Sequence, residues 1–263
     1  MQAFAYSTPT TVADALRAGA AEDAKYLGGG QSLLPSMKLG LNAPASLVDL
    51  GGIAELQGIK VDGGNVIIGA GTTHAAVAAS PEVQKAIPAL ADLAGKIGDR
   101  QVRNRGTLGG SLANDDPAAC YPAAVLGLGA TVHTNLRQIA ADDFFLGIYT
   151  TALEEGEIIT AVSFPIPEKS GWQKFKQPAS RFSLVGVFVS KGPQGVRVAV
   201  TGAGACVFRA TSLEARLASN WSPAALDGAT VPAEDLNSDL HGSAEYRAAL
   251  IPVLAARAVA AAA

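Results

Sequence analysis

The hydrophobic pattern of the first 50 residues alternates between short helix and short strand signals. Thr10 and Thr11 can cap a helix over 12–19 (VADALRAG) that ends at Gly19. The next apolar run, AKYL at 24–27, predicts a short buried strand that leads directly into three glycines. This order of elements indicates a βαβ-like start.

The pattern of the middle region changes from strand-like to helix-like. Two apolar runs within residues 57–70 flank the turn Asp62-Gly63-Gly64-Asn65, which is a hairpin signal. Helical periodicity follows, and Ser80-Pro81 separates the first two segments that show it. The region therefore predicts a mixed α+β structure, with helices over 74–80, 87–98 and 117–129.

The character of the chain changes again near residue 165, where SFPIPEKSG is rich in turn formers. Two β-rich runs, 183–190 and 196–204, follow with a Gly-Pro-Gln-Gly turn between them. Helical segments over 210–219 and 245–263 complete the chain. The last hundred or so residues thus predict a small antiparallel sheet covered by helices.

Composition narrows the functional classes. Of 263 residues 49% are apolar and 16% charged, yet no run approaches the roughly 18 apolar residues of a membrane helix. The N-terminus lacks the basic and apolar segments of a signal peptide, so we expect a cytoplasmic protein. A net charge of -3 with scattered Lys and Arg disfavours nucleic acid as a partner.

Cysteine and histidine usage argues against a metal centre in this chain. Cys120 and Cys206 are far apart, whereas an iron–sulfur cluster needs about four thiolates. His74, His133 and His241 are isolated and show no spacing typical of metal ligands. We therefore predict no metal site.

The first candidate site is a glycine-rich loop. Gly28-Gly29-Gly30 follows the predicted strand, and Gln31-Ser32-Leu33 leads into a helical pattern. Glycines let successive backbone N–H groups converge on one point, which suits a phosphate. A single loop of this kind is more often only a tight turn.

A second loop, Thr107-Leu108-Gly109-Gly110-Ser111, repeats the composition of the first. Three arginines precede it, and Asn114, Asp115 and Asp116 follow it. Two such loops can hold two phosphates. Neither loop matches the dinucleotide fingerprint G-x-G-x-x-G, and no Gly-Lys-Ser/Thr triplet of a P-loop is present.

Five ordered segments resemble a known family. They are GGGQSLLPSMKLG, IIGAGTTHAAVAAS, IGDRQVRNRGTLGGSLANDDPAACYPAAVLGLGA, DDFFLGIYTTALEEGEIITAVSFP and FKQPASRFSLVGV. Their order and content are similar to the FAD-binding medium subunit of molybdenum hydroxylases of the carbon monoxide dehydrogenase, xanthine dehydrogenase and aldehyde oxidoreductase type. The resemblance extends over essentially the whole chain.

The resemblance implies an α+β fold of the p-cresol methylhydroxylase type. Two subdomains would grip FAD, and a C-terminal antiparallel sheet domain with helices would close over the flavin. We expect the subdomains at 1–55 and 56–165 and the C-terminal flavoprotein domain at 166–263. The change of character near residue 165, at the turn-rich segment, agrees with this division.

The family's cofactor contacts can be carried over to matching positions of this chain. The two glycine-rich loops would hold the pyrophosphate, Ile97 and Ile159 would be apolar contacts, and Lys176 would lie near the flavin. A cation there can stabilise negative charge on the reduced ring, although an exposed lysine on a strand is the plain alternative. The expected FAD-binding residues are Leu27, Gly28, Gly29, Gly30, Gln31, Ser32, Leu33, Ile97, Thr107, Gly109, Gly110, Ser111, Asn114, Asp116, Ile159 and Lys176.

One position departs from the family pattern. Where the family commonly has an acidic residue in a DPAAD-like segment, this chain has Cys120. A carboxylate that can accept from cofactor hydroxyls is therefore missing, which predicts a lower FAD affinity unless Asp115 or Asp116 replaces it. Asp116 before Pro117 is equally interpretable as a helix N-cap.

The resemblance implies electron transfer through FAD, with no side chain of this chain acting as acid, base or nucleophile. An iron–sulfur small subunit with [2Fe–2S] clusters and a large subunit with the molybdenum cofactor would be the partners, in a dimer of heterotrimers. The external acceptor would be NAD, oxygen or a quinone. Two alternatives stay open: a stand-alone FAD-dependent oxidase of the same fold superfamily, and a non-catalytic binding module.

Overall fold

The computed structural model describes residues 2–263, and its N-terminal part is a small parallel sheet. The strands β1 (Ala5–Ser7), β2 (Ala24–Leu27) and β3 (Ser46–Asp49) are arranged in the order β1-β3-β2. The predicted first helix is confirmed as α1 (Val12–Gly19), where Thr11 Oγ1 accepts from Asp14 N at 3.1 Å. Strand β2 is confirmed too, but only its Leu27 is buried, so the expectation that this strand is buried is wrong for its other residues.

A five-stranded antiparallel sheet forms the middle of the molecule, in the order β4-β5-β10-β6-β7. The predicted hairpin is confirmed, because Asp62 and Asn65 pair at the turn of β4 and β5. Strand β10 includes Phe164 and Pro165. The sequence had indicated a turn-rich segment there, not a strand. Pro165 is tolerated because β6 pairs with β10 only as far as Ser163. The strands are β4 (Ile59–Asp62), β5 (Asn65–Gly69), β6 (Thr131–Thr134), β7 (Gln138–Ala140) and β10 (Ile159–Pro165).

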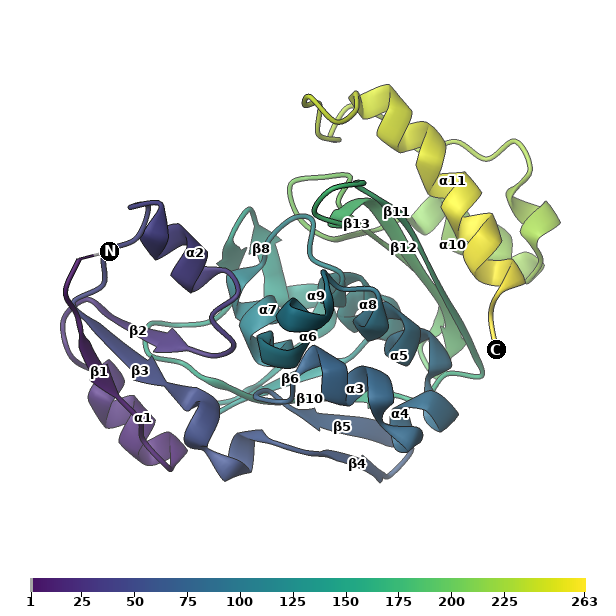
Figure 1. The fold of residues 1–263 in the computed structure, drawn as a ribbon. Helices are drawn as coiled ribbons and strands as arrows, with labels where there is room; N and C mark the ends of the chain where they lie inside the picture. Colours follow the sequence, from purple (N-terminus) through teal and green to yellow (C-terminus); the bar gives the residue numbers. More distant parts are fainter. Residues whose placement is uncertain (1) are drawn as a thin grey trace.

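Helices cover one face of this sheet (Figure 1). The Ser80-Pro81 pair does not separate two helices by a loop, as the sequence had indicated. Instead it starts another helix, since Ser80 Oγ accepts from Val83 N and Pro81 occupies the first helical position. The helices are α2 (Leu33–Lys38), α3 (His74–Ala79), α4 (Pro81–Ala86), α5 (Pro88–Gly95), α6 (Arg100–Arg105), α7 (Leu108–Asn114), α8 (Tyr121–Leu128) and α9 (Ala141–Phe144). Short 3₁₀ turns at Leu50–Gly52 and Ala54–Leu56 and the small hairpin β8 (Phe145–Gly147) and β9 (Thr150–Thr151) complete this part.

The C-terminal part confirms the predicted antiparallel sheet with helices on it. Its strands follow chain order, from β11 to β14, and the turn after Gly192 joins β12 to β13 as expected. Figure 1 shows α10 and α11 on the outer side of this sheet. Strand β11 was not predicted, because its Lys and Gly residues hide the strand pattern. The elements are β11 (Lys169–Lys176), β12 (Ser183–Gly192), β13 (Gly195–Thr201), β14 (Phe208–Arg209), α10 (Thr211–Ser219), a 3₁₀ turn at Pro223–Leu226 and α11 (Ala244–Ala260).

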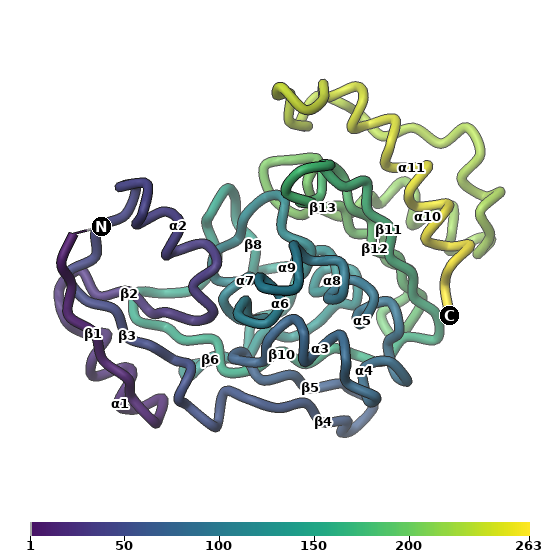
Figure 2. The backbone as a smooth tube through the Cα atoms, in the orientation of Figure 1, coloured from purple at the N-terminus to yellow at the C-terminus, as the bar shows by residue number. Residues whose placement is uncertain are grey.

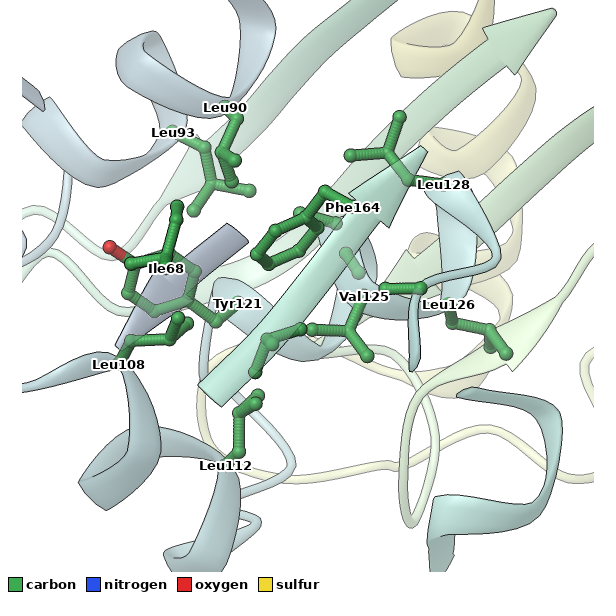
Figure 3. Packing of buried hydrophobic residues seen from close by; sticks show 14 of the residues in the cluster. Ile68, Leu90, Leu93, Leu108, Leu112, Tyr121, Val125, Leu126, Leu128 and Phe164 are labelled. Carbon is green, nitrogen blue, oxygen red and sulfur yellow. The ribbon is translucent and has the colours of Figure 1, made fainter. Parts of the chain in front are cut away.

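Helix α8 is the centre of the largest apolar core. All eight of its residues are buried, so it has no polar face. Figure 3 shows its residues with Leu90 and Leu93 of α5, Leu108 and Leu112 of α7 and Phe164 of β10. The same core includes Phe188 and Ala199 from β12 and β13. Helix α8 is therefore packed between the two larger sheets.

Side chains of the C-terminal sheet hold the last carbonyls of α8. Arg197 Nε donates to Leu126 O at 2.8 Å, Ser190 Oγ to Gly127 O at 2.6 Å and Gln194 Nε2 to Gly129 O at 2.9 Å. A cation at a helix C-terminus is favourable, and Asp142 pairs with this buried guanidinium at 2.5 Å. These bonds satisfy carbonyl groups that a buried helix end would otherwise leave without partners.

The backbone trace places the chain ends in different parts of the molecule (Figure 2). The N-terminus lies beside the small parallel sheet, while the C-terminus lies at the edge of the C-terminal sheet. There Ala263 exchanges backbone hydrogen bonds with Ser170 at the start of β11. None of the helices described for residues 2–263 has the length and apolar character to cross a membrane.

Gly171 permits the close packing of α11 on β11, which gives a test of this interface. A Cβ at position 171 would lie 2.0 Å from the backbone oxygen of Ala258. We expect Gly171→Ala to lower the free energy of unfolding by about 1–3 kcal/mol, because backbone atoms must shift to relieve the overlap. Urea denaturation measures the change. Gly147→Ala is the control, since nothing lies within 4 Å of its added Cβ; equal losses in both variants would contradict the packing argument.

Candidate functional site

A cavity of about 480 Å³ lies where the small parallel sheet meets the loops around α6 and α7. Its walls come from segments far apart in the sequence: the ends of β2, β3 and β5, the α6–α7 region and the start of β10. The lining residues are Tyr26, Gly28, Gly29, Asp49, Leu50, Gly51, Leu56, Gln57, Ala70, Gly71, Thr73, Asn104, Arg105, Thr107, Gly109, Gly110, Ala113, Leu153, Glu157, Ile158 and Ile159.

The two glycine-rich loops pack directly against each other at this cavity. A Cβ on Gly29 would lie 1.9 Å from Arg105 O, and one on Gly28 would lie 3.0 Å from Thr107 Oγ1. A Cβ on Gly109 would meet Ala70 Cβ at 2.6 Å. Gly28 and Gly29 are therefore needed for the approach of the first loop to the segment around the second, and Gly109 for close packing on the end of β5, whatever the loops bind.

The backbone of the second loop is tied to the end of β5 and the start of α3. Leu108 N donates to Thr72 O at 3.0 Å, and Gly109 N donates to Ala70 O at 2.8 Å. Gly110 N donates to Thr107 Oγ1 at 3.1 Å, which caps α7. Ser111 N donates to Thr107 O at 3.0 Å, so four N–H groups of this loop already have protein acceptors.

The first loop is different, because its N–H groups are free. Within residues 2–263, the backbone N–H groups of Gly29, Gly30, Gln31 and Ser32 donate to no protein acceptor. Gly30 has φ of +70°, a left-handed conformation that turns the chain sharply. Successive free N–H groups in a turn form an anion-binding concavity.

Six of the predicted site residues line the cavity together: Gly28, Gly29, Thr107, Gly109, Gly110 and Ile159. Gly30, Gln31 and Ser32 lie in the same loop but outside the cavity wall. Leu27 and Leu33 pack with Met37 in a small apolar cluster beneath the loop. Ser111 and Asn114 belong to α7 and do not line the cavity.

Three predicted residues lie away from the cavity. Ile97 packs against the large core, and Lys176 is exposed at the end of β11. Asp116 does not cap α8, whose N-cap residue is Cys120. Its Oδ1 accepts instead from Ala118 N at 2.8 Å and stabilises the turn before the helix.

Sequence reasoning missed several polar residues of the cavity. Asp49 had a usable signal, because it ends a strand parallel to the one that leads into the first loop. Arg105 is one of the three arginines that precede the second loop in the sequence; within residues 2–263 its guanidinium has no carboxylate partner. Gln57, Asn104 and Glu157 carried no sequence signal.

Glu157 is a buried carboxylate that anchors the cavity wall. Burial alone would raise the pKa of Glu157, but hydrogen bonds from Arg137, Thr134 and Glu154 N lower it to about 2. The carboxylate therefore stays charged at all ordinary pH values. Its bonds fix the segment that leads into Ile158 and Ile159.

His74 supports the second loop from behind. Its backbone N donates to Gly106 O at 2.9 Å, and its ring lies 5.3 Å from the ring of Tyr121. Burial lowers the pKa of His74 to about 4, and the nearby charge of Arg103 acts in the same direction. The imidazole is therefore neutral at physiological pH and acts as a packing group.

Asp115 ends α7 in a left-handed conformation with φ of +41°. Its side chain is buried, and neither carboxylate oxygen has a hydrogen-bond partner within the described residues. Burial raises the pKa of Asp115 to about 7, and the charge of Asp116 adds to the shift. This group thus changes charge near neutral pH.

Position 120, where the family pattern has an acid, faces a lysine. Cys120 Sγ lies 3.4 Å from Lys174 Nζ and 3.4 Å from Ser183 Oγ. Lys174 Nζ also donates to Lys96 O at 2.9 Å. The partly buried cation of β11 beside this position is therefore Lys174, while Lys176 is exposed.

Comparison with known proteins now identifies the family. Residues 2–167 match the family described as the FAD binding domain in molybdopterin dehydrogenase. The chain belongs to this family. It is 37% identical to the nicotine 6-hydroxylase medium subunit of Paenarthrobacter nicotinovorans, over 98% of this chain and 97% of the relative. It is 36% identical to the carbon monoxide dehydrogenase medium chain of Hydrogenophaga pseudoflava, over 97% and 96%.

Solved structures agree. Carbon monoxide dehydrogenase from Hydrogenophaga pseudoflava, in a form that lacks the Mo-pyranopterin moiety of its molybdenum cofactor, superposes with a TM-score of 0.88 at 34% identity, covering 99% of this chain and 97% of that one. Quinoline 2-oxidoreductase from Pseudomonas putida 86 gives 0.88 at 32% identity, over 99% and 96%. The resemblance and the flavoprotein fold predicted from the sequence are confirmed. The chain is an FAD-binding medium subunit of the molybdenum hydroxylase type and an oxidoreductase subunit.

The site fits the FAD that this family binds. Four free N–H groups of the first loop can receive pyrophosphate oxygens, and Arg105 beside them can balance the charge. The cavity volume lies in the range of small-molecule sites. Among residues 2–263, no group of three or more His, Cys, Asp or Glu side chains is arranged to hold a metal ion.

The contact between the loops predicts that Gly29 is essential for cofactor retention. In Gly29→Ala the new Cβ would overlap the backbone oxygen of Arg105 at 1.9 Å, so the loops must separate. We expect FAD affinity to fall about tenfold or more, measured by flavin fluorescence quenching on titration of the apo chain. Gly52→Ala is the control, because its Cβ would meet only Pro9 O at 3.5 Å. Unchanged affinity in Gly29→Ala would show that this close approach is not needed for FAD binding.

Asp115 predicts an unusual pH dependence of stability. Its folded pKa of about 7 lies above the usual 3.8, so the free energy of unfolding falls as pH rises from about 4 to 7 and stays low above 7. We expect Asp115→Asn to be more stable than the parent at about pH 8 by about 1–3 kcal/mol, with most of this gain lost near pH 4. Chemical denaturation across this range measures it. Asp143→Asn, an exposed carboxylate, should show no such trend; a pH-independent gain in Asp115→Asn would exclude the charge as the cause.

Proposed function

We propose that this chain binds FAD and passes electrons from an iron–sulfur partner subunit to an external acceptor such as NAD, oxygen or a quinone. The observation that carries the proposal is the row of free N–H groups from Gly29 to Ser32, in a loop whose Gly28 and Gly29 line the cavity. Backbone donors of this kind are suited to a pyrophosphate, which joins the two halves of FAD. The identity to medium subunits over nearly the whole chain supports the same role.

FAD, when bound, supplies the ability to exchange electrons singly and in pairs. This chain's own residues bind and orient the cofactor. The first loop would receive the pyrophosphate, Thr107 and the second loop would support it from the opposite side, and Ile159 would give an apolar contact. Lys174 or Lys176 would place positive charge on the C-terminal side of the site.

The partners follow from what this chain lacks in sequence and from the names of its relatives. Two cysteines are too few for an iron–sulfur cluster, so the [2Fe–2S] clusters must lie in another subunit. Relatives called medium chain or medium subunit belong to larger enzymes, including carbon monoxide dehydrogenase. We propose that the molybdenum cofactor lies in a large subunit and that the assembly is a dimer of heterotrimers.

The domain division and the location belong to the same proposal. Residues 1–55 and 56–165 would form the two FAD-binding subdomains, and 166–263 the C-terminal flavoprotein domain. This division is supported by β10, which ends the five-stranded sheet at Pro165, and by β11, which begins the next sheet at Lys169. Two free cysteines support a cytoplasmic location, where thiols stay reduced.

The absorption spectra of the purified complex and of this chain alone test the proposal. We expect acid to release about one FAD per medium chain, with cluster absorption confined to the partner subunits. Substrate should bleach the flavin only when the partners are present, because electrons arrive through them. Absence of flavin from both samples would favour a binding module, and turnover of an alcohol or phenol by the chain alone would favour a stand-alone oxidase.

A further inference from the structure

The cavity extends beyond the first loop toward the end of β3. In the parallel pairing of β2 and β3, Leu27 is directly opposite Asp49, so Asp49 is adjacent to the first glycine of the loop. Ligands of parallel sheets bind at the carboxyl ends of the strands. Asp49 lies at such an end and lines the cavity. Asp49 can therefore contact the part of a ligand that extends into the cavity from a group bound at the first loop.

The carboxylate of Asp49 is held in a fixed orientation. Its Oδ1 accepts from Gly51 N at 2.8 Å, and its Oδ2 accepts from the hydroxyl of Tyr6. A carboxylate has about four acceptor positions, so two of them stay available. Free acceptor positions on a carboxylate suit a neutral group that donates hydrogen bonds, such as a pair of sugar hydroxyls, and not a further phosphate.

Gln57 supplies a second polar group in the same part of the cavity. Its side-chain amide lies over Gly71, where an added Cβ would be 2.4 Å from Nε2. No protein group within residues 2–263 bonds to this amide, which can both donate and accept. A glutamine amide matches the donor and acceptor pattern of an adenine edge. Leu50, Leu56 and Ile158 give apolar walls for a planar base.

We propose that Asp49 and Gln57 bind the adenosine half of FAD, with Asp49 accepting from the ribose hydroxyls and Gln57 pairing with the adenine edge. The proposal rests on the function proposed above and makes these two residues the determinants that select FAD over FMN. Among the residues that the structure describes, none beyond Ile159 lines this cavity, so the C-terminal sheet is not part of its wall. The flavin half accordingly lies on the other side of the first loop.

Binding of FAD, FMN and ADP to the full-length apo chain tests this inference. FMN keeps the flavin but lacks adenosine, and ADP keeps the adenosine half alone. In Asp49→Asn we expect the dissociation constants of FAD and ADP to rise about tenfold, with that of FMN unchanged. Gln57→Leu should weaken FAD and ADP several-fold and also leave FMN unaffected. Fluorescence quenching reports the flavins, and calorimetry reports ADP.

Asp49→Asn retains an oxygen that can accept from Gly51 N, so the turn after β3 is preserved. Asp62→Asn is the matched control, since this exposed carboxylate lies at the β4–β5 turn outside the cavity. Equal weakening of FAD and FMN, or no weakening of ADP, would overturn the adenosine assignment while leaving FAD binding intact. Failure of the parent chain to bind any flavin would instead overturn the proposed function itself, together with this inference.

Discussion

A helix with no exposed face organises this protein. Every residue of α8 is buried, with the five-stranded sheet and its helices on one side and the C-terminal sheet on the other. The C-terminal end of such a helix has carbonyl groups that cannot reach water. Ser190 and Arg197 of the C-terminal sheet and Gln194 of its β12–β13 turn donate to them. Because these donors come from the sheet, the helix can be satisfied only when both parts of the molecule are in place.

The segment before α8 transmits this constraint to the cofactor site. Pro117 O accepts from Gly202 N at 2.8 Å, and Thr201 Oγ1 donates to Ala119 O at 2.7 Å, so the turn between α7 and α8 is bound to β13. Helix α7 begins with the second glycine-rich loop, and that loop meets the first one at Gly28, beside Thr107 and Gly110. The position of the free N–H groups is therefore fixed by packing on the far side of the molecule.

The two loops are both rich in glycine but have different physical roles. In the second loop the protein itself accepts the N–H groups of Leu108, Gly109 and Gly110, so its glycines serve mainly close packing. In the first loop the N–H groups stay free for a ligand. The buried polar groups nearby also differ: Glu157 is fully paired, His74 stays neutral, and Asp115 has no partner and titrates near neutral pH.

The sequence by itself determined the α+β class, the hairpin at Asp62–Asn65, the C-terminal antiparallel sheet and the family, because periodicity and glycine-rich motifs are local properties. Only the tertiary structure decided which N–H groups are free. Those of Leu108 and Gly109 in the second loop are bonded to Thr72 O and Ala70 O, which are distant in sequence. The tertiary structure also places Asp49 and Gln57 in the wall of the cavity, and it places the amine of Lys174 beside the thiol of Cys120. Such contacts depend on strand register and on the approach of separate segments, which local pattern does not encode.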